Sequence, residues 1–169
     1  MLLCMIIYSS TLLTSLAIYD RVAIIEGEVW RLFSGLFVHL SLMHLLSNVL
    51  AFVVLSMLLA EDKNYRVLLG TMFLIQGILL LVLEENTRYY GGISGINYAL
   101  LFYFLFSMKT SCRVEKSLLL LILIILSIRV LIGGEEESFT VSTLSHIIGI
   151  LTACLVYLLR WLSRRATLL

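Results

Sequence analysis

The stretch YRVLLGTMFLIQGILLLVL, residues 65–83, contains one charged side chain and is otherwise mainly apolar. A helix needs about 20 predominantly apolar residues to cross the hydrocarbon core of a membrane. The stretch therefore predicts a transmembrane helix. Five further apolar runs flank it, at about residues 2–19, 35–60, 94–108, 117–132 and 140–161. Together the runs predict an all-α membrane protein, a bundle of six transmembrane helices.

The composition of the chain argues against a water-soluble fold. Hydrophobic residues make up 61% of the 169 residues, and charged residues make up 14%. A soluble domain of this size needs far more charge to cover its surface. The formal net charge is only +1, so there is no basic face for nucleic acid, and we predict no such partner. Because the connections between the runs are short, residues 1–169 are predicted to form one domain.

The first run, residues 2–19, has a length and composition that could be mistaken for a signal peptide. It lacks a basic segment at its start, and no clear small-x-small cleavage site follows it. We therefore predict that it is a retained first transmembrane helix.

Lysine and arginine residues gather on one side of the predicted bundle. Eight of the twelve follow the second, fourth and sixth runs: Lys63, Arg66, Lys109, Arg113, Lys116, Arg160, Arg164 and Arg165. By the positive-inside rule, that side faces the cytosol. We predict that both termini are cytosolic and that the chain is a multi-pass protein of the bacterial inner (cytoplasmic) membrane, with the lipid bilayer around it.

Four polar residues lie at a similar predicted depth in the membrane. Ser94 begins the fourth run, and His146 lies near the start of the sixth. His44 and Asn48 lie on the second run, four residues apart and so on one helix face. At about 1.5 Å of rise per residue, each group is about 20–25 Å from the cytosolic end of its helix. In a hydrocarbon core about 30 Å thick, all four would lie somewhat below the outer surface.

The spacing around these residues favours close contact between the fourth and sixth helices. Tyr98 lies four residues after Ser94 and shares its face. Gly149 lies three residues after His146 and begins a stripe of small residues, which lets membrane helices approach closely. The fourth run is too short to cross the membrane, so the loop before it is expected to dip inward. Gly92 gives that loop the necessary conformational freedom.

Each of these residues, taken alone, has a structural explanation. A serine in a membrane helix commonly bonds to its own backbone, and a buried histidine or asparagine can tie two helices together. Several intramembrane polar groups at one depth, on facing helices, instead favour a functional site. The combination predicts a serine nucleophile, Ser94, with a histidine base, His146.

Four segments carry a family resemblance. They are EVWR at 28–31, HLSLMHLLSN at 39–48, GISGINYAL at 92–100 and SHIIG at 145–149. In this order they resemble the motifs of the rhomboid family of intramembrane serine proteases, over about residues 28–155. The G-x-S-G pattern alone is weak evidence, whereas the combined set is specific.

The resemblance implies a six-helix fold that cleaves transmembrane protein substrates near their outer end. It assigns Ser94 as nucleophile and His146 as general base, a dyad without a carboxylate. His44, Asn48 and the backbone N–H of Ser94 would stabilise the oxyanion. No metal ion or cofactor is implied, and no oligomeric state is predicted.

The resemblance also implies supporting roles for Tyr98, Gly92, Gly95, Gly149, Trp30, Arg31 and His39. Tyr98 would pack against the catalytic imidazole, Trp30 and Arg31 would brace the first loop, and His39 would support that loop. Asn97 departs from the family pattern, because an apolar residue is expected there. The small size of the chain resembles the rhombosortase subgroup, which is thought to process C-terminal sorting signals.

The sequence leaves three other interpretations open. A catalytically inactive rhomboid-like protein that binds membrane clients would not need both Ser94 and His146. A metalloprotease or metal transporter could use His39, His44 and His146, but there is no H-E-x-x-H motif, and five residues is a poor spacing for two ligands on one helix face. A purely structural or channel-like bundle leaves the matched depth of the polar groups unexplained.

Overall fold

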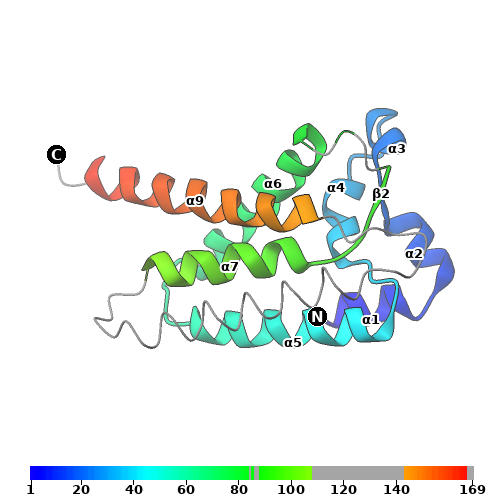
Figure 1. Ribbon diagram of the computed structural model, residues 1–169, viewed down its shortest axis with the longest axis horizontal. Coiled ribbons are helices and arrows are strands. Elements are labelled where there is room, and N and C mark those ends of the chain that lie inside the picture. The colour runs from blue at the N-terminus through cyan, green and yellow to red at the C-terminus, as the bar shows by residue number, and fades with distance from the viewer. Residues whose placement is uncertain (84, 86–87, 108–142, 167–169) are drawn as a thin grey trace.

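Four long helices carry the fold in the computed structural model, which describes residues 1–83, 85, 88–107 and 143–166. They are α5 (Leu42–Leu58), α6 (Tyr65–Leu83), α7 (Ser94–Ser107) and α9 (Thr143–Ala166). Helices α5, α7 and α9 lie side by side and begin at the same end of the molecule (Figure 1). The predicted helical class is therefore confirmed, and the runs at 65–83 and 94–108 form helices within one residue of the predicted bounds.

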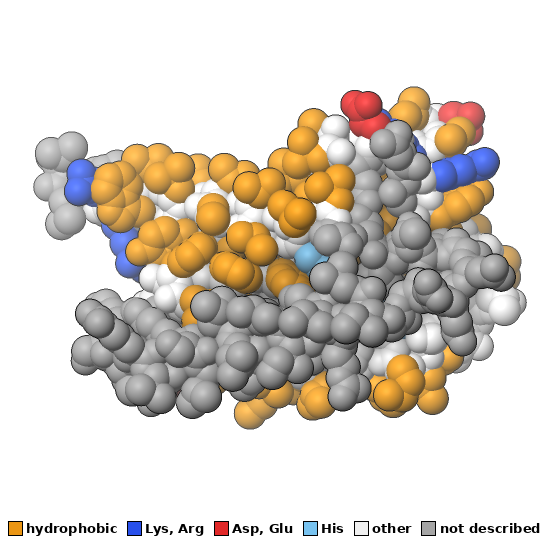
Figure 2. Space-filling model, viewed as in Figure 1, with side chains coloured by type: hydrophobic (Ala, Val, Ile, Leu, Met, Phe, Trp, Pro, Cys, Tyr) orange, Lys and Arg blue, Asp and Glu red, His pale blue; other side chains and the backbone are white. Residues whose placement is uncertain are grey.

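The outer surface of the bundle suits a lipid environment. Within the described residues, α6 and the Leu144–Arg165 part of α9 are long and apolar enough to cross a membrane. Figure 2 shows apolar side chains over the length of the bundle and charged ones toward its two ends. Exposure of large apolar side chains such as Leu50 (67% exposed) and Met57 (70%) to water would be unfavourable. This apolar surface is that of an integral membrane protein.

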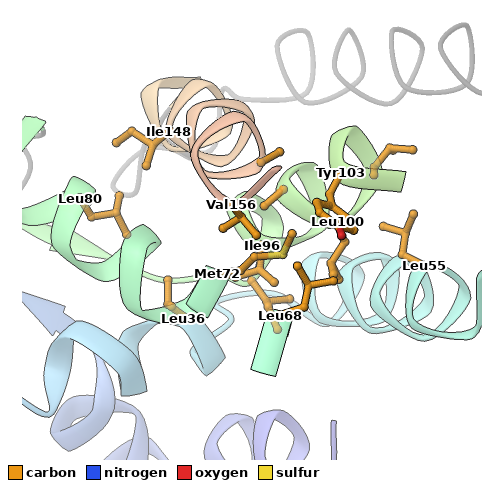
Figure 3. Close-up of a cluster of buried hydrophobic side chains, with 14 of the residues drawn as sticks. Leu36, Leu55, Leu68, Met72, Leu80, Ile96, Leu100, Tyr103, Ile148 and Val156 are labelled. Carbon is orange, nitrogen blue, oxygen red and sulfur yellow. The ribbon is translucent and has the colours of Figure 1, made fainter. Parts of the chain in front are cut away.

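The core lies where α6, α7 and α9 meet (Figure 3). Met72, Ile96, Leu100 and Ile148 each have 0% exposure. The close approach of α7 and α9 depends on glycine, because a Cβ atom at Gly149 would strike the backbone carbonyl of Gly95. This crossing point sets the distance between the first turns of the two helices.

The prediction of a continuous first helix over residues 2–19 is wrong. The structure has two helices of seven residues, α1 (Leu2–Tyr8) and α2 (Thr11–Ala17). The break occurs because Ser10 adopts an extended backbone and its side chain accepts a hydrogen bond from the Leu13 N–H, which starts a new helix.

The second predicted helix, at 35–60, begins later than expected. A short helix α4 (Arg31–Ser34) and a 3₁₀ turn η1 (Gly35–Phe37) come first, and α5 follows after a bend of 99°. Ser41 caps the start of α5 by accepting a hydrogen bond from the His44 N–H at 3.2 Å. His44 therefore lies in the first turn of its helix, as Ser94 does in α7.

Short extended segments connect the two halves of the chain. Strand β1 (Tyr19–Asp20), which precedes helix α3 (Arg21–Ile25), pairs antiparallel with β2 (Tyr89–Tyr90). Neither strand was expected from the sequence. This pairing fixes the segment that leads into α7. The predicted run at 117–132, and the predicted cytosolic residues Lys109, Arg113 and Lys116, lie outside the described residues.

Candidate active site

Ser94 and His146 are in direct contact. Ser94 opens α7, His146 lies in the first turn of α9, and the serine Oγ is 3.1 Å from the histidine Nε2. Both residues are buried, with exposures of 9% and 7%. With the ring proton on Nδ1, Nε2 can accept the serine hydroxyl proton. This is the geometry that a nucleophile and its general base require.

The ring of Tyr98 fixes the plane of the His146 imidazole. The two rings are stacked, with centroids 4.4 Å apart and planes 19° apart. Tyr98 lies one helical turn beyond Ser94 on α7, so one helix presents both the hydroxyl and the ring that supports its partner. Among the described residues, no carboxylate hydrogen-bonds to His146.

The turn before Ser94 requires glycine. Gly92 has a φ of +133°, a conformation that other residues rarely adopt. Its N–H donates to the Gly35 carbonyl at 3.2 Å, and its own carbonyl accepts from the Tyr90 hydroxyl at 2.8 Å. A Cβ atom here would lie 3.2 Å from Nε2 of His44. The glycine therefore admits the His44 ring against the backbone that leads to the nucleophile.

Asn48 also faces the start of α7. It is buried, and its Nδ2 donates to the backbone carbonyl of His44 at 2.9 Å. Its side chain accepts a hydrogen bond from Asn97, three residues after Ser94, at 3.0 Å. The structure thus gathers His44 and Asn48 of α5 beside the first turn of α7, where the dyad lies.

His39 supports this arrangement from the bend before α5. It is 1% exposed, its Nδ1 lies 3.1 Å from the Phe37 carbonyl, and its ring packs edge-on against His44 with centroids 5.0 Å apart. The third histidine of the metal-binding interpretation, His146, is paired with Ser94. Among the described residues, no group of three potential ligands is placed to hold a metal ion.

Trp30 and Arg31 lie away from the dyad. Arg31 is buried, and its Nη1 donates to the carbonyls of Ser15 and Ile18, both at 2.9 Å. Trp30 is 53% exposed, and its Nε1 donates to the Leu16 carbonyl at 3.4 Å. Both side chains join the region of α4 to the end of α2.

Gln76 was not among the predicted site residues, and it is 0% exposed at the helix crossing. Its Nε2 donates to the carbonyl of Ser145, the residue before His146, at 3.2 Å. Its Oε1 accepts from the hydroxyl of Thr152 at 3.1 Å. The amide thus ties α6 to two points on α9, next to the base. A lone glutamine within the apolar run 65–83 was the available signal.

Comparison with protein families agrees with the motifs. A family model described as a rhomboid domain matches residues 26–163. The match includes all four sequence motifs and every candidate site residue from Trp30 to Gly149. No curated protein matches the sequence. The resemblance inferred from the motifs is confirmed.

Proposed function

Because the chain belongs to the rhomboid family, whose members are generally intramembrane serine proteases, we propose that it hydrolyses peptide bonds of transmembrane protein substrates. Ser94 is the nucleophile and His146 the general base in this proposal. The observation that carries it is the 3.1 Å contact between the serine Oγ and the histidine Nε2.

In the first step, the Ser94 Oγ attacks the scissile carbonyl carbon while His146 takes the hydroxyl proton on Nε2. The tetrahedral intermediate collapses, the C–N bond breaks, and the imidazolium gives the proton to the leaving amine. A water molecule, deprotonated by the same imidazole, then attacks the acyl carbon; the ester C–O bond breaks, and the imidazolium returns the proton to the Ser94 Oγ. The stacked ring of Tyr98 would keep the imidazole oriented through both steps, the function that a carboxylate has in a triad.

The oxyanion would form at the start of α7. The backbone N–H of Ser94 belongs to the first turn of that helix, whose dipole favours negative charge. One N–H of the Asn48 amide bonds to the His44 carbonyl, which leaves the second available to a ligand. The His44 ring, against Gly92, is the third donor of the proposed oxyanion site.

For substrates and topology, we propose transmembrane segments cut near their outer end, by a single six-span domain with cytosolic termini, in a bacterial inner membrane. Helix-weakening residues in the substrate would expose its backbone, since an intact helix hides its carbonyls in hydrogen bonds. Processing of C-terminal sorting signals, as in rhombosortases, is a narrower form of this proposal. An inactive client-binding protein would have no need for a buried serine–histidine contact.

A fluorophosphonate probe tests the dyad, because it phosphonylates only an activated serine. The purified wild-type protein in proteoliposomes should be labelled, and Ser94→Ala and His146→Ala should not. Ser107→Ala, at the far end of α7, is the matched control and should be labelled like the wild type. Labelling that persists in Ser94→Ala would exclude Ser94 as the nucleophile.

A further inference from the structure

Asn97 is a buried polar residue on the face of α7 that meets α5. It is 7% exposed and lies between Ser94 and Tyr98, at a position where the family resemblance implies an apolar side chain. Its Nδ2 donates to two oxygens of Asn48, to Oδ1 at 3.0 Å and to the backbone carbonyl at 3.1 Å. Its Oδ1 has no hydrogen-bond partner among the described residues. A buried amide is unfavourable unless paired, so this one calls for an explanation.

Two hydrogen bonds, one from Asn97 and one to the His44 carbonyl, hold the two ends of the Asn48 amide. Asn48 Oδ1 accepts from Asn97, and Asn48 Nδ2 donates to the His44 carbonyl. A primary amide carries two N–H donors. The second N–H of Asn48 therefore stays available, in a direction set by the two bonds already made.

This pairing permits only one orientation of the Asn48 amide. The two ends of a primary amide have nearly the same shape, and a half-turn exchanges the donor with the acceptor. A turned Asn48 would present its Nδ2 to the Asn97 donor and its Oδ1 to the His44 carbonyl, two mismatched contacts. A turned Asn97 would place its own Oδ1 against both oxygens of Asn48. Both amides are therefore fixed by their partners.

Orientation matters because an oxyanion is stabilised by an N–H group and repelled by a carbonyl oxygen. We infer that Asn97 is a positioning residue that holds the Asn48 amide with its N–H toward the oxyanion. Asn97 acts through Asn48 and does not contact the substrate. The inference rests on the proposed protease function.

Substitution of Asn97 in the full-length protein in proteoliposomes tests this role. Asn97→Leu removes the donor at similar volume, and Asn97→Ser is a smaller second variant whose hydroxyl is too short to replace the amide. Cleavage of a transmembrane substrate should show a kcat lower by about tenfold to a hundredfold, the scale of a misplaced catalytic group, with little change in KM. The rate of fluorophosphonate labelling should fall with kcat.

A double-mutant cycle separates positioning from simple helix attachment. In an Asn48→Ala background, a second change at Asn97 should lower kcat no further, because the group that Asn97 orients is already gone. Tyr103→Phe is the matched control, since it removes another hydrogen bond between α7 and a neighbouring helix, the one that the buried Tyr103 accepts from Arg160. It should lower the melting temperature and leave kcat at the wild-type value.

Three outcomes would overturn the inference. They are an unchanged kcat in both Asn97 variants, decreases in kcat that multiply with the decrease caused by Asn48→Ala, and unfolding of both variants. Each would assign Asn97 to helix attachment. Failure of the protease function itself is distinguishable. It would appear in the wild-type protein as absent cleavage, or in Ser94→Ala as retained cleavage.

Discussion

Among single residues, the candidate site depends on a few buried polar groups whose partners are other buried polar groups. Ser94 contacts His146, Tyr98 stacks on that imidazole, and Asn97 bonds to Asn48. In a membrane, such groups are costly to leave unpaired. Each side chain is therefore oriented by the same contacts that make its burial tolerable.

Gly92 gives a prediction for a single residue in the turn before the nucleophile. Gly92→Ala should lower cleavage activity by about a hundredfold, because alanine disfavours a φ of +133° and its Cβ would displace the His44 ring. It should also lower the melting temperature. The measurement is kcat in proteoliposomes together with thermal unfolding in detergent.

Gly70→Ala is the control for this change. No atom lies within 4 Å of the added Cβ, and Gly70 lies within α6, where alanine favours the helix by about 1 kcal/mol. Activity should be unchanged and stability slightly higher. Full activity in Gly92→Ala would mean that the turn before Ser94 does not position the catalytic groups.

At the scale of helices, attachment of α9 to its neighbours determines where the base lies. Gln76→Leu should lower the stability of the protein by about 1 kcal/mol, the scale of interhelical hydrogen bonds in membranes. It should also lower kcat, because the hydrogen bond from Gln76 to the Ser145 carbonyl, one residue before His146, is lost. Thermal unfolding and substrate cleavage are the two measurements.

The control lies on the same helix as Gln76. Among the described residues, the Thr71 hydroxyl bonds to the Val67 carbonyl of α6 itself, so Thr71→Val should change stability by less than about 0.5 kcal/mol and leave kcat unchanged. Thr152→Val, which removes one of the two bonds of Gln76, should have an intermediate effect. Equal stability of Gln76→Leu and Thr71→Val would contradict a role for Gln76 in attaching α9.

Helices were predictable from the sequence where an apolar run had one clear beginning. Runs 65–83 and 94–108 became α6 and α7, whereas 2–19 divided in two, because apolar composition alone does not reveal a capping serine inside a run. The contact between Ser94 and His146 was likewise foreseen, from depth and from the stripe at Gly149. The partners of Gln76 and Asn97 were not, since they depend on side-chain contacts between helices.

Over the whole molecule, polar contacts hold both ends of the bundle. The dyad lies at one end of α9, and Arg160 lies fourteen residues away, about 21 Å along the helix. There Arg160 forms an ion pair with Asp62, in the connection between α5 and α6, and also donates to Tyr103 of α7. This second contact fixes the far ends of the helices whose first turns form the site.

The ion pair gives a pH prediction. The hydrogen bond from Arg160 lowers the pKa of Asp62 below its ordinary value. A carboxyl group whose pKa is lower in the folded state stabilises the fold above its unfolded pKa, about 3.9, and this contribution is lost as pH falls through the folded pKa. Asp62→Asn should therefore lower the melting temperature at pH 7, with a smaller effect in high salt.

Below the folded pKa of Asp62, the wild type and Asp62→Asn should have the same melting temperature, because the wild-type carboxyl is then protonated. Glu61→Gln, one residue earlier and exposed, is the control and should leave the melting temperature at pH 7 unchanged. A difference between wild type and Asp62→Asn that is constant from pH 7 to pH 3 would exclude the ionised carboxylate as its cause.

Topology is the remaining prediction at this scale, because it determines the membrane face on which cleavage occurs. Helices α5, α7 and α9 begin at the same end (Figure 1), so the candidate site lies toward that end of the bundle. The sequence predicts that eight of the twelve Lys and Arg residues lie on the cytosolic side. That side includes the connection between α5 and α6, so we predict that the site lies toward the outer face.

Cysteine accessibility in intact spheroplasts measures this orientation, with the three native cysteines replaced by serine. A cysteine at Glu26 should react with a membrane-impermeant maleimide, and one at Asn64 should react only after permeabilisation. A cysteine at Leu2 tests the first span separately, because α1 and α2 are each too short to cross alone, at about 10 Å. If α1 and α2 form a broken span together, position 2 reacts like position 64. Reaction of position 2 from outside would exclude that span. Reaction of position 64 from outside would mean that the site faces the cytosol.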